Sequence, residues 1–140
     1  MRNLLLASAA ALTVALAAPA FADDNTVSVT QTGTGNNSSQ DVSGGTYNTS
    51  VIYQSDNGGS SATHTIVGSN NTVYSYQGNV TPGTNNFVGV VVDGGGIGNQ
   101  VTSTQNGTGN QASINVNSTN YNTVSVTQTG VNNIAYQHVH

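Results

Sequence analysis

A seven-residue phrase that opens with Asn and closes with Gln recurs five times along this chain. The copies occupy residues 25–31, 48–54, 71–77, 99–105 and 122–128, and successive copies start 23, 23, 28 and 23 residues apart. A fixed period of this size indicates one supersecondary unit stacked on copies of itself, so each unit buries its faces against its neighbours rather than in a central globular core. The period therefore predicts a solenoid.

Within each phrase the side chains alternate in character. Every second position of the first copy holds Asn25, Val27, Val29 and Gln31, and the positions between them hold Thr or Ser. Period two over seven residues predicts a β-strand with two different faces. The face that carries Thr and Ser is expected to lie toward water, and the other face toward the interior.

A weaker strand follows each phrase and shows the same alternation. These second strands cover residues 36–42, 60–66, 86–92, 110–116 and 133–139. A turn with glycine separates the two strands of each repeat, because glycine adopts the positive φ angles of tight reversals. The turn glycines are Gly33, Gly58, Gly83, Gly107 and Gly130. We therefore expect an all-β, five-rung β-solenoid of strand, turn, strand, turn repeats that stacks as cross-β structure.

The first 22 residues differ in composition from the rest of the chain. A basic start at Arg2 precedes an apolar run over 4–18 that is too short to span a bilayer, and a small-x-small cleavage site ends at Ala22. These features predict a signal peptide over 1–22 and a secreted mature chain over 23–140 without stable membrane insertion. The five repeats are expected at about 25–47, 48–70, 71–98, 99–121 and 122–140.

The composition of the mature chain excludes several function classes. Residues 23–140 contain five Asp but no Lys, Arg, Glu or Cys. Nucleic acid is not an expected partner, because binding to phosphates requires cationic side chains. An enzyme is not expected, since scattered Asp residues supply no general base, acid or charge stabiliser in a concave pocket. Of the three histidines His64, His138 and His140, the last two share a strand face, but no third convergent ligand is visible, so neither a metal nor another cofactor is predicted.

Stacking of like rungs is expected to place the Asn residues in one column and the Gln residues in another. Side-chain amides carry donors and acceptors, so copies spaced by about 4.8 Å can bond indefinitely. The predicted ladder residues are Asn25, Gln31, Asn48, Gln54, Asn71, Gln77, Asn99, Gln105, Asn122 and Gln128. Residues 25–33 and 122–130 are identical, so the two ends of the stack present matching patterns. Head-to-tail homopolymerisation is the predicted function.

The pattern Gln-x-Gly-x-x-Asn resembles the curlin repeat of bacterial curli subunits. It is intact at Gln31-Gly33-Asn36, Gln105-Gly107-Asn110 and Gln128-Gly130-Asn133. The resemblance covers all five repeats, and the stretch 126–140 looks like the end of a major curlin subunit. One departure is that the second strands, which usually end in Gln in this family, end here in Val or Ile.

The resemblance implies a secreted functional amyloid, the structural fibre subunit of a biofilm matrix that serves adhesion and surface colonisation. Its expected location is in extracellular fibres on the bacterial cell surface. The implied partners are further copies of the chain, a minor curlin nucleator and a curli secretion channel that exports the chain across the outer membrane.

Two roles remain open for the Asp residues of the middle repeats. Asp56 and Asp93 lie beside glycines, which is typical of ordinary turns. Alternatively, they act as gatekeepers that slow premature β-pairing before export. Tyrosine residues of the middle strands are expected to face outward and to stack on one another.

The alternative function is a monomeric secreted β-solenoid that binds a surface such as ice or polysaccharide. It would use an outward column that contains Thr26, Thr49, Thr72 and Thr123. Gln100 interrupts this column, and neighbouring columns mix Ser, Val, Tyr and Thr, so no uniform lattice results. Polymerisation is therefore the favoured prediction.

Overall fold

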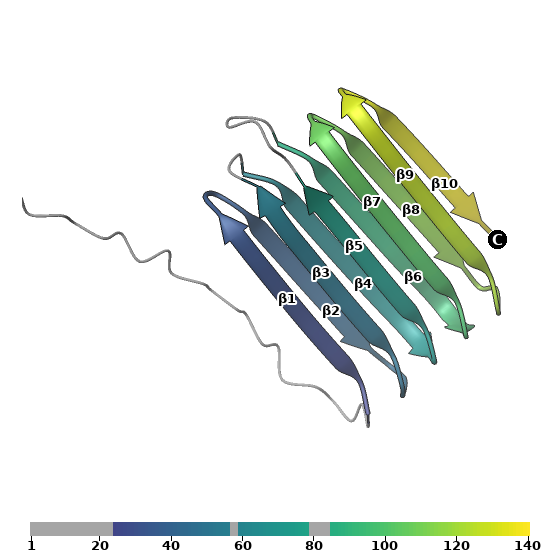
Figure 1. Cartoon of the computed structure of the whole chain (residues 1–140). Helices are drawn as coiled ribbons and strands as arrows, with labels where there is room; N and C mark the ends of the chain where they lie inside the picture. Colours follow the sequence, from purple (N-terminus) through teal and green to yellow (C-terminus); the bar gives the residue numbers. More distant parts are fainter. Residues whose placement is uncertain (1–23, 57–58, 79–84) are drawn as a thin grey trace, which may run out of the picture.

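Two face-to-face parallel β-sheets make up the structure (Figure 1). The computed structural model describes residues 24–56, 59–78 and 85–140, and every regular element in them is a β-strand. The predicted signal peptide over 1–22 lies outside the described residues, as do the turn residues Gly58 and Gly83. The prediction of an all-β solenoid is confirmed.

Each sheet contains five strands, one from each repeat. The first sheet has the order β1-β3-β5-β7-β9, with bounds Thr26–Gly33, Thr49–Asp56, Thr72–Gly78, Gln100–Thr108 and Thr123–Val131. The second has the order β2-β4-β6-β8-β10, with bounds Asn37–Ser43, Ser61–Ser69, Phe87–Ile97, Gln111–Asn117 and Ile134–Val139. We call each odd strand and the even strand that follows it a rung, and number the rungs 1 to 5 from β1.

The strands pair in a register that aligns the repeated phrases. Thr26 pairs with Thr49, Thr49 with Thr72, Thr72 with Gln100, and Gln100 with Thr123. Parallel pairing in this register places equivalent positions of successive repeats above one another. The outward Thr column is therefore present in the structure, interrupted at Gln100 as the sequence indicated.

A thin core of aliphatic side chains lies between the sheets. Burial alternates along the strands, and in β4 every second residue is buried. One aliphatic column runs through all five rungs at the ends of the second strands, and it contains Val42, Ile66, Val92, Val116 and Val139. Full burial of such a side chain contributes about 1.5–3 kcal/mol. Polar side chains fill the remaining interior, and they form the candidate site described below.

The longer third repeat has a structural counterpart in β6. Ile66 pairs with Val92, but the next matched pair is Gly68 with Gly96, so β6 bulges between these pairs. The first two glycines of this bulge have φ angles of 74° and 75°, a left-handed conformation that favours glycine. Asp93, for which an ordinary turn was one of two predicted roles, lies instead in this bulged strand.

Candidate self-assembly site

The Gln residues that close the five phrases form one continuous ladder between the sheets. Gln31 Nε2 donates to Gln54 Oε1 at 2.7 Å, and Gln54 Nε2 donates to Gln77 Oε1 at 2.8 Å. The ladder continues from Gln77 to Gln105 at 3.0 Å and from Gln105 to Gln128 at 2.8 Å. Each amide nitrogen donates toward the rung with the higher number. The ladder therefore has a direction.

The same amides also join the two sheets. Gln77 Nε2 donates to the Ser61 carbonyl at 3.0 Å, and Gln105 Nε2 donates to the Phe87 carbonyl at 2.9 Å. Gln54, Gln77 and Gln105 are completely buried. A buried amide is stabilising only when its donors and acceptors have partners, and these amides have them in two directions. Each ladder residue therefore holds both the adjacent rungs and the facing strands.

The Asn residues that open the phrases form a ladder of different chemistry. The backbone N–H of Asn48 donates to Asn25 Oδ1 at 2.8 Å, and that of Asn71 donates to Asn48 Oδ1 at 2.9 Å. The same bond joins Asn99 to Asn71 and Asn122 to Asn99, each at 3.0 Å. In rungs 1 to 4 the Nδ2 group donates to a backbone carbonyl at the end of the second strand or in the turn that follows it, just before the next phrase. These side chains therefore satisfy the backbone where it leaves one sheet for the other.

A third ladder, which the predicted site residues did not include, lies at the opposite turn. It consists of Asn36, Ser60, Asn86, Asn110 and Asn133, and each backbone N–H donates to the side-chain oxygen of the preceding rung at 3.0–3.3 Å. The signal in the sequence is the Asn that follows Gln by five residues in the first, fourth and fifth repeats. The sequence also aligned all five positions as the starts of the second strands, but it did not identify them as ladder residues.

The ladders end in complementary groups at the two ends of the stack. On rung 1, no donor in the described part of the chain reaches Gln31 Oε1. On rung 5, Gln128 Nε2 donates to the Gln111 carbonyl at 3.0 Å, which uses one of its two hydrogens. In the Asn ladder, the backbone N–H of Asn25 has no acceptor among the described residues. The side-chain oxygen of Asn122 has no donor among them. The unpaired groups on rung 1 are therefore complementary to those on rung 5, with a donor on one end for each acceptor on the other.

Backbone N–H groups at the two ends follow the same polarity. The N–H of the outward-facing Thr26 donates to the Asn48 carbonyl on the next rung at 2.8 Å, and equivalent bonds follow on the later rungs. Successive residues of a strand direct their N–H groups to opposite edges. On rung 5, outward-facing residues such as Ser125 therefore direct their N–H groups to the open end beyond rung 5. On rung 1, inward-facing residues such as Val27 direct theirs to the open end before rung 1.

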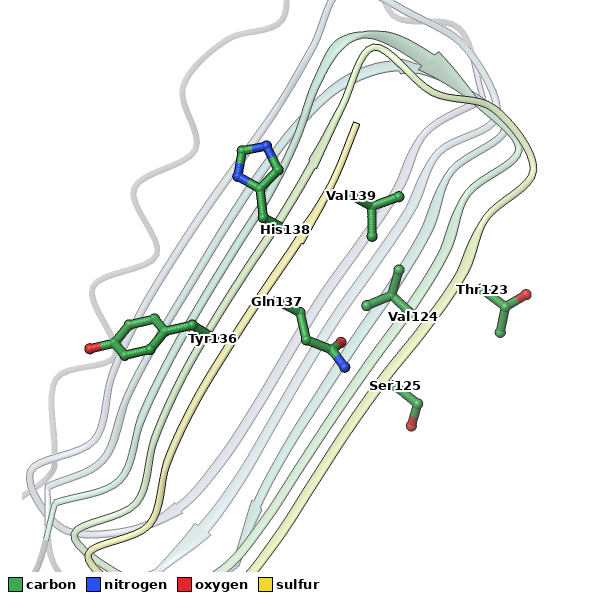
Figure 2. A pocket seen from close by; sticks show the side chains of 7 residues that line it. All are labelled: Thr123, Val124, Ser125, Tyr136, Gln137, His138 and Val139. Carbon is green, nitrogen blue, oxygen red and sulfur yellow. The ribbon is translucent and has the colours of Figure 1, made fainter.

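Rung 5 ends in an open hollow between β9 and β10. Its lining residues are Thr123, Val124, Ser125, Tyr136, Gln137, His138 and Val139. Figure 2 shows Val124, Gln137 and Val139 directed into the space between the two strands, whereas Tyr136 and His138 point away from it. The interior of the solenoid is therefore uncovered at this end.

A buried histidine lies in the middle of the stack. His64 Nδ1 is 2.9 Å from Ser50 Oγ, and His64 Nε2 is 2.6 Å from Ser75 Oγ. The ring is completely buried, and this burial lowers the pKa of His64 to about 4. The imidazole is therefore neutral at pH 7. Although serine and histidine are adjacent here, no substrate can reach them, so the cluster is a structural bridge between rungs 2 and 3.

The predicted turn glycines lie at the ends of β1, β7 and β9, just before the turns, and they adopt a left-handed backbone conformation. Gly33, Gly107 and Gly130 have φ angles of 106°, 117° and 113°. A Cβ atom on Gly107 would collide with the carbonyl oxygen of Gly130 on the next rung. Close stacking of the turns therefore requires glycine at this position.

The two predicted gatekeepers lie on neighbouring rungs. Asp56 ends β3 and pairs with Gly33, and its side chain lies outside the described residues. Asp93 is exposed in β6, where its Oδ1 accepts the Gly94 N–H at 2.6 Å. A role in slowing premature β-pairing stays a prediction for both residues.

The outward face of the first sheet carries a mixture of side chains. Tyr53 and Tyr76 stack with their ring centroids 5.2 Å apart and their planes nearly parallel. Tyr74 is also exposed on this face, beside the Thr column. The surface therefore lacks the repetitive flatness that a lattice-binding face needs.

The described part of the chain contains no group of three or more His, Cys, Asp or Glu side chains placed to hold a metal ion. His138 and His140 lie edge to face with ring centroids 5.2 Å apart, without a third ligand among these residues. In the same residues, no helix has the length and apolarity that a membrane crossing requires.

Comparison with known proteins found no matching family model, no matching curated protein and no matching solved structure.

Proposed function

We propose that this chain is the structural subunit of an extracellular, curli-like amyloid fibre that grows by head-to-tail stacking. The observation that carries the proposal is the direction of the Gln ladder, which leaves an acceptor at Gln31 on rung 1 and a donor at Gln128 on rung 5. A second copy placed on rung 5 supplies both missing partners. The Asn25 N–H and the Asn122 side-chain oxygen complete each other in the same way.

The register of such a junction follows from the pairing inside the molecule. Residues 25–33 and 122–130 are identical, so β1 of the next molecule can continue the sheet beyond β9 as β9 continues it beyond β7. Thr26 of the next molecule then lies opposite Thr123, at a strand spacing of roughly 4.8 Å. Repetition of this contact generates an open-ended fibre.

The surfaces at the two ends also favour association. Their edge strands carry unpaired backbone groups, a template on which another chain can add. Apolar side chains are exposed on the terminal rungs, with Val27 49 % exposed on rung 1 and Val131 65 % exposed on rung 5. The formal net charge of the chain is only −4, so repulsion between copies is weak. Stacking therefore removes unpaired polar groups and exposed apolar area together.

The cellular setting is proposed from the sequence resemblance. The subunit leaves the cell through a curli secretion channel in the outer membrane, and fibre growth starts on a minor curlin nucleator. The fibres remain on the cell surface, where they contribute to the biofilm matrix, to adhesion and to surface colonisation.

Proline variants at the two ends test the proposal. Val27→Pro removes an N–H directed to the preceding molecule, and Ser125→Pro removes one directed to the following molecule. Neither N–H bonds to another residue in the described part of the chain, so both variants should keep the fold but cap growing fibres. We expect a small molar fraction of each variant to stop growth at one end of wild-type fibres, and the two variants together to stop elongation, followed by electron microscopy and light scattering. Ser28→Pro is the matched control, because it removes an N–H directed to rung 2 and should lose ordered β structure.

Wild-type protein should form fibres with a reflection near 4.8 Å along the fibre axis, as cross-β stacking requires. A wild-type chain that stays monomeric for days at high concentration, with an ordered β signal by circular dichroism, contradicts the proposal. That outcome favours the monomeric solenoid that binds ice or polysaccharide through the Thr column.

A further inference from the structure

The second sheet contains an interior column in which amide side chains occur only at the two ends. From rung 1 to rung 5 the column consists of Gln40, His64, Val90, Ile114 and Gln137. The Gln residues of this column therefore have no amide neighbour inside the molecule. This differs from the first sheet, where Gln recurs on every rung.

The amide on rung 1 has an unused acceptor. Gln40 Nε2 donates to Ser50 Oγ at 2.9 Å, but Gln40 Oε1 is buried and has no hydrogen-bond partner. A buried polar atom without a partner costs free energy. The amide on rung 5 is in the opposite situation, because Gln137 is exposed and directed into the open hollow, where it makes no hydrogen bond with the described residues (Figure 2).

The adjacent outward column repeats this arrangement with charge. From rung 1 to rung 5 it consists of Asp41, Thr65, Val91, Asn115 and His138. Its two ionisable residues are therefore at opposite ends of the molecule. The other titratable groups described on this outward face are Asp93 in rung 3 and, beside His138 in rung 5, Tyr136 and His140.

We propose that the β10 edge of one molecule recognises the β2 edge of the next through a hydrogen bond from the side-chain amide of Gln137 to Gln40 Oε1 and a charge pair between His138 and Asp41. This inference rests on the proposed head-to-tail assembly and adds the contacts that select the partner. The partner is a second copy of this chain.

The register of the second sheet places both pairs correctly. Ala112 pairs with Ala135, and Ser38 pairs with Ala62, so continuing this register beyond β10 places Ser38 of the next molecule opposite Ala135. Two and three residues later the facing pairs are Gln137 with Gln40 and His138 with Asp41, each about 4.8 Å apart. Gln137 then donates toward the neighbouring molecule in the same direction as every amide of the Gln ladder.

These contacts select both register and partner. Residues of a strand alternate between its faces, so a slip of the incoming molecule by one residue would place the inward Gln137 opposite the outward Ser39 or Asp41. A foreign stack with Val or Ile at the position of Gln40 would leave Gln137 without an acceptor. The junction between molecules therefore differs chemically from the contacts between rungs inside one molecule.

A charge exchange tests the ionic pair. Seeded elongation is measured at pH 6.0, since histidine residues change charge between pH 5 and 8, for wild type, Asp41→His, His138→Asp and the double variant that carries both changes. Each single variant places like groups at the junction and should elongate about two- to fivefold more slowly, a loss that 0.5 M salt should reduce. The double variant restores opposite charges and should regain the wild-type rate. Asp93→Asn is the control for loss of one charge away from the junction.

Replacement of the amide tests the other contact. Gln137→Leu keeps a side chain of similar size but removes the donor to Gln40, and the concentration of soluble chain left at the plateau should rise about two- to tenfold.

The outcomes separate this inference from the proposed function. If wild type does not elongate, head-to-tail assembly itself is wrong. If wild type elongates but the double variant is no faster than His138→Asp, or Gln137→Leu leaves the plateau unchanged, the proposed contact is wrong and assembly through the first sheet stands.

Discussion

Protonation of His64 is expected to destabilise the stacked structure in acid. The imidazole is completely buried between rungs 2 and 3 and hydrogen-bonds to Ser50 and Ser75. A proton placed on this ring creates a charge without a counterion in a dry interior. The folded chain therefore resists protonation more strongly than the unfolded chain.

The size of the effect follows from the two pKa values. Burial lowers the pKa of His64 from 6.5 to about 4 in the folded chain. Between these values the unfolded chain binds more protons than the folded chain, so stability is complete above pH 6.5 and falls as the pH decreases toward 4. A shift of about 2.5 units, at about 1.4 kcal/mol per unit, corresponds to a loss of about 3 kcal/mol.

The assay is the concentration of soluble chain without ordered β structure in equilibrium with fibres, measured at intervals from pH 7 to pH 4, because His64 is exposed only when the chain unfolds. A loss of about 3 kcal/mol raises this concentration on the order of a hundredfold, because each 1.4 kcal/mol is a factor of ten. His64→Gln is the control, since it retains a hydrogen-bonding side chain but cannot titrate. The soluble concentration of the His64→Gln variant should change with pH only through the titration of its other ionisable side chains.

An equal pH response of wild type and His64→Gln between pH 6.5 and 4 would refute the reasoning. It would mean that His64 is either hydrated or able to find a counterion in the assembled state. A variant that fails to assemble at pH 7 leaves a second measurement, the histidine NMR titration of assembled wild type, which should show one ring that stays neutral at pH 5.

Two further predictions concern the ladders and turns. Gln77→Ala should lower the denaturant midpoint of assembled protein more than Gln31→Ala, since it leaves ladder neighbours unpaired on both sides. Gln31→Ala should instead slow seeded elongation more than Gln77→Ala. If one variant had the larger effect in both assays, this prediction would be contradicted. Gly107→Ala should destabilise the fold by more than about 1 kcal/mol relative to Gly95→Ala, because both glycines have positive φ but only the first would place a Cβ against Gly130. Equal denaturation midpoints would show that the turns do not stack closely.

The sequence by itself determined the repeating architecture of this protein. A spacing of 23 residues and an alternation of period two are local properties, and together they specify stacked rungs whose strands have one buried and one solvent-exposed face. Because every phrase has the same length, the columns from Gln31 to Gln128 and from Asn25 to Asn122 could be predicted without coordinates. The Val and Ile column at the ends of the second strands was predicted from the same alternation along those strands.

Only the tertiary structure decided how these columns are connected. The sequence aligned the column from Asn36 through Ser60 to Asn133 at the starts of the second strands, but it did not show that these side chains accept the backbone N–H groups of the next rung. The direction of the amide bonds, the bulge that contains Asp93 and the burial of His64 likewise depend on groups from different rungs. The physical reason is that hydrogen-bond direction and burial belong to a set of strands in register and not to any one strand. The complementarity of the two ends arises at that level.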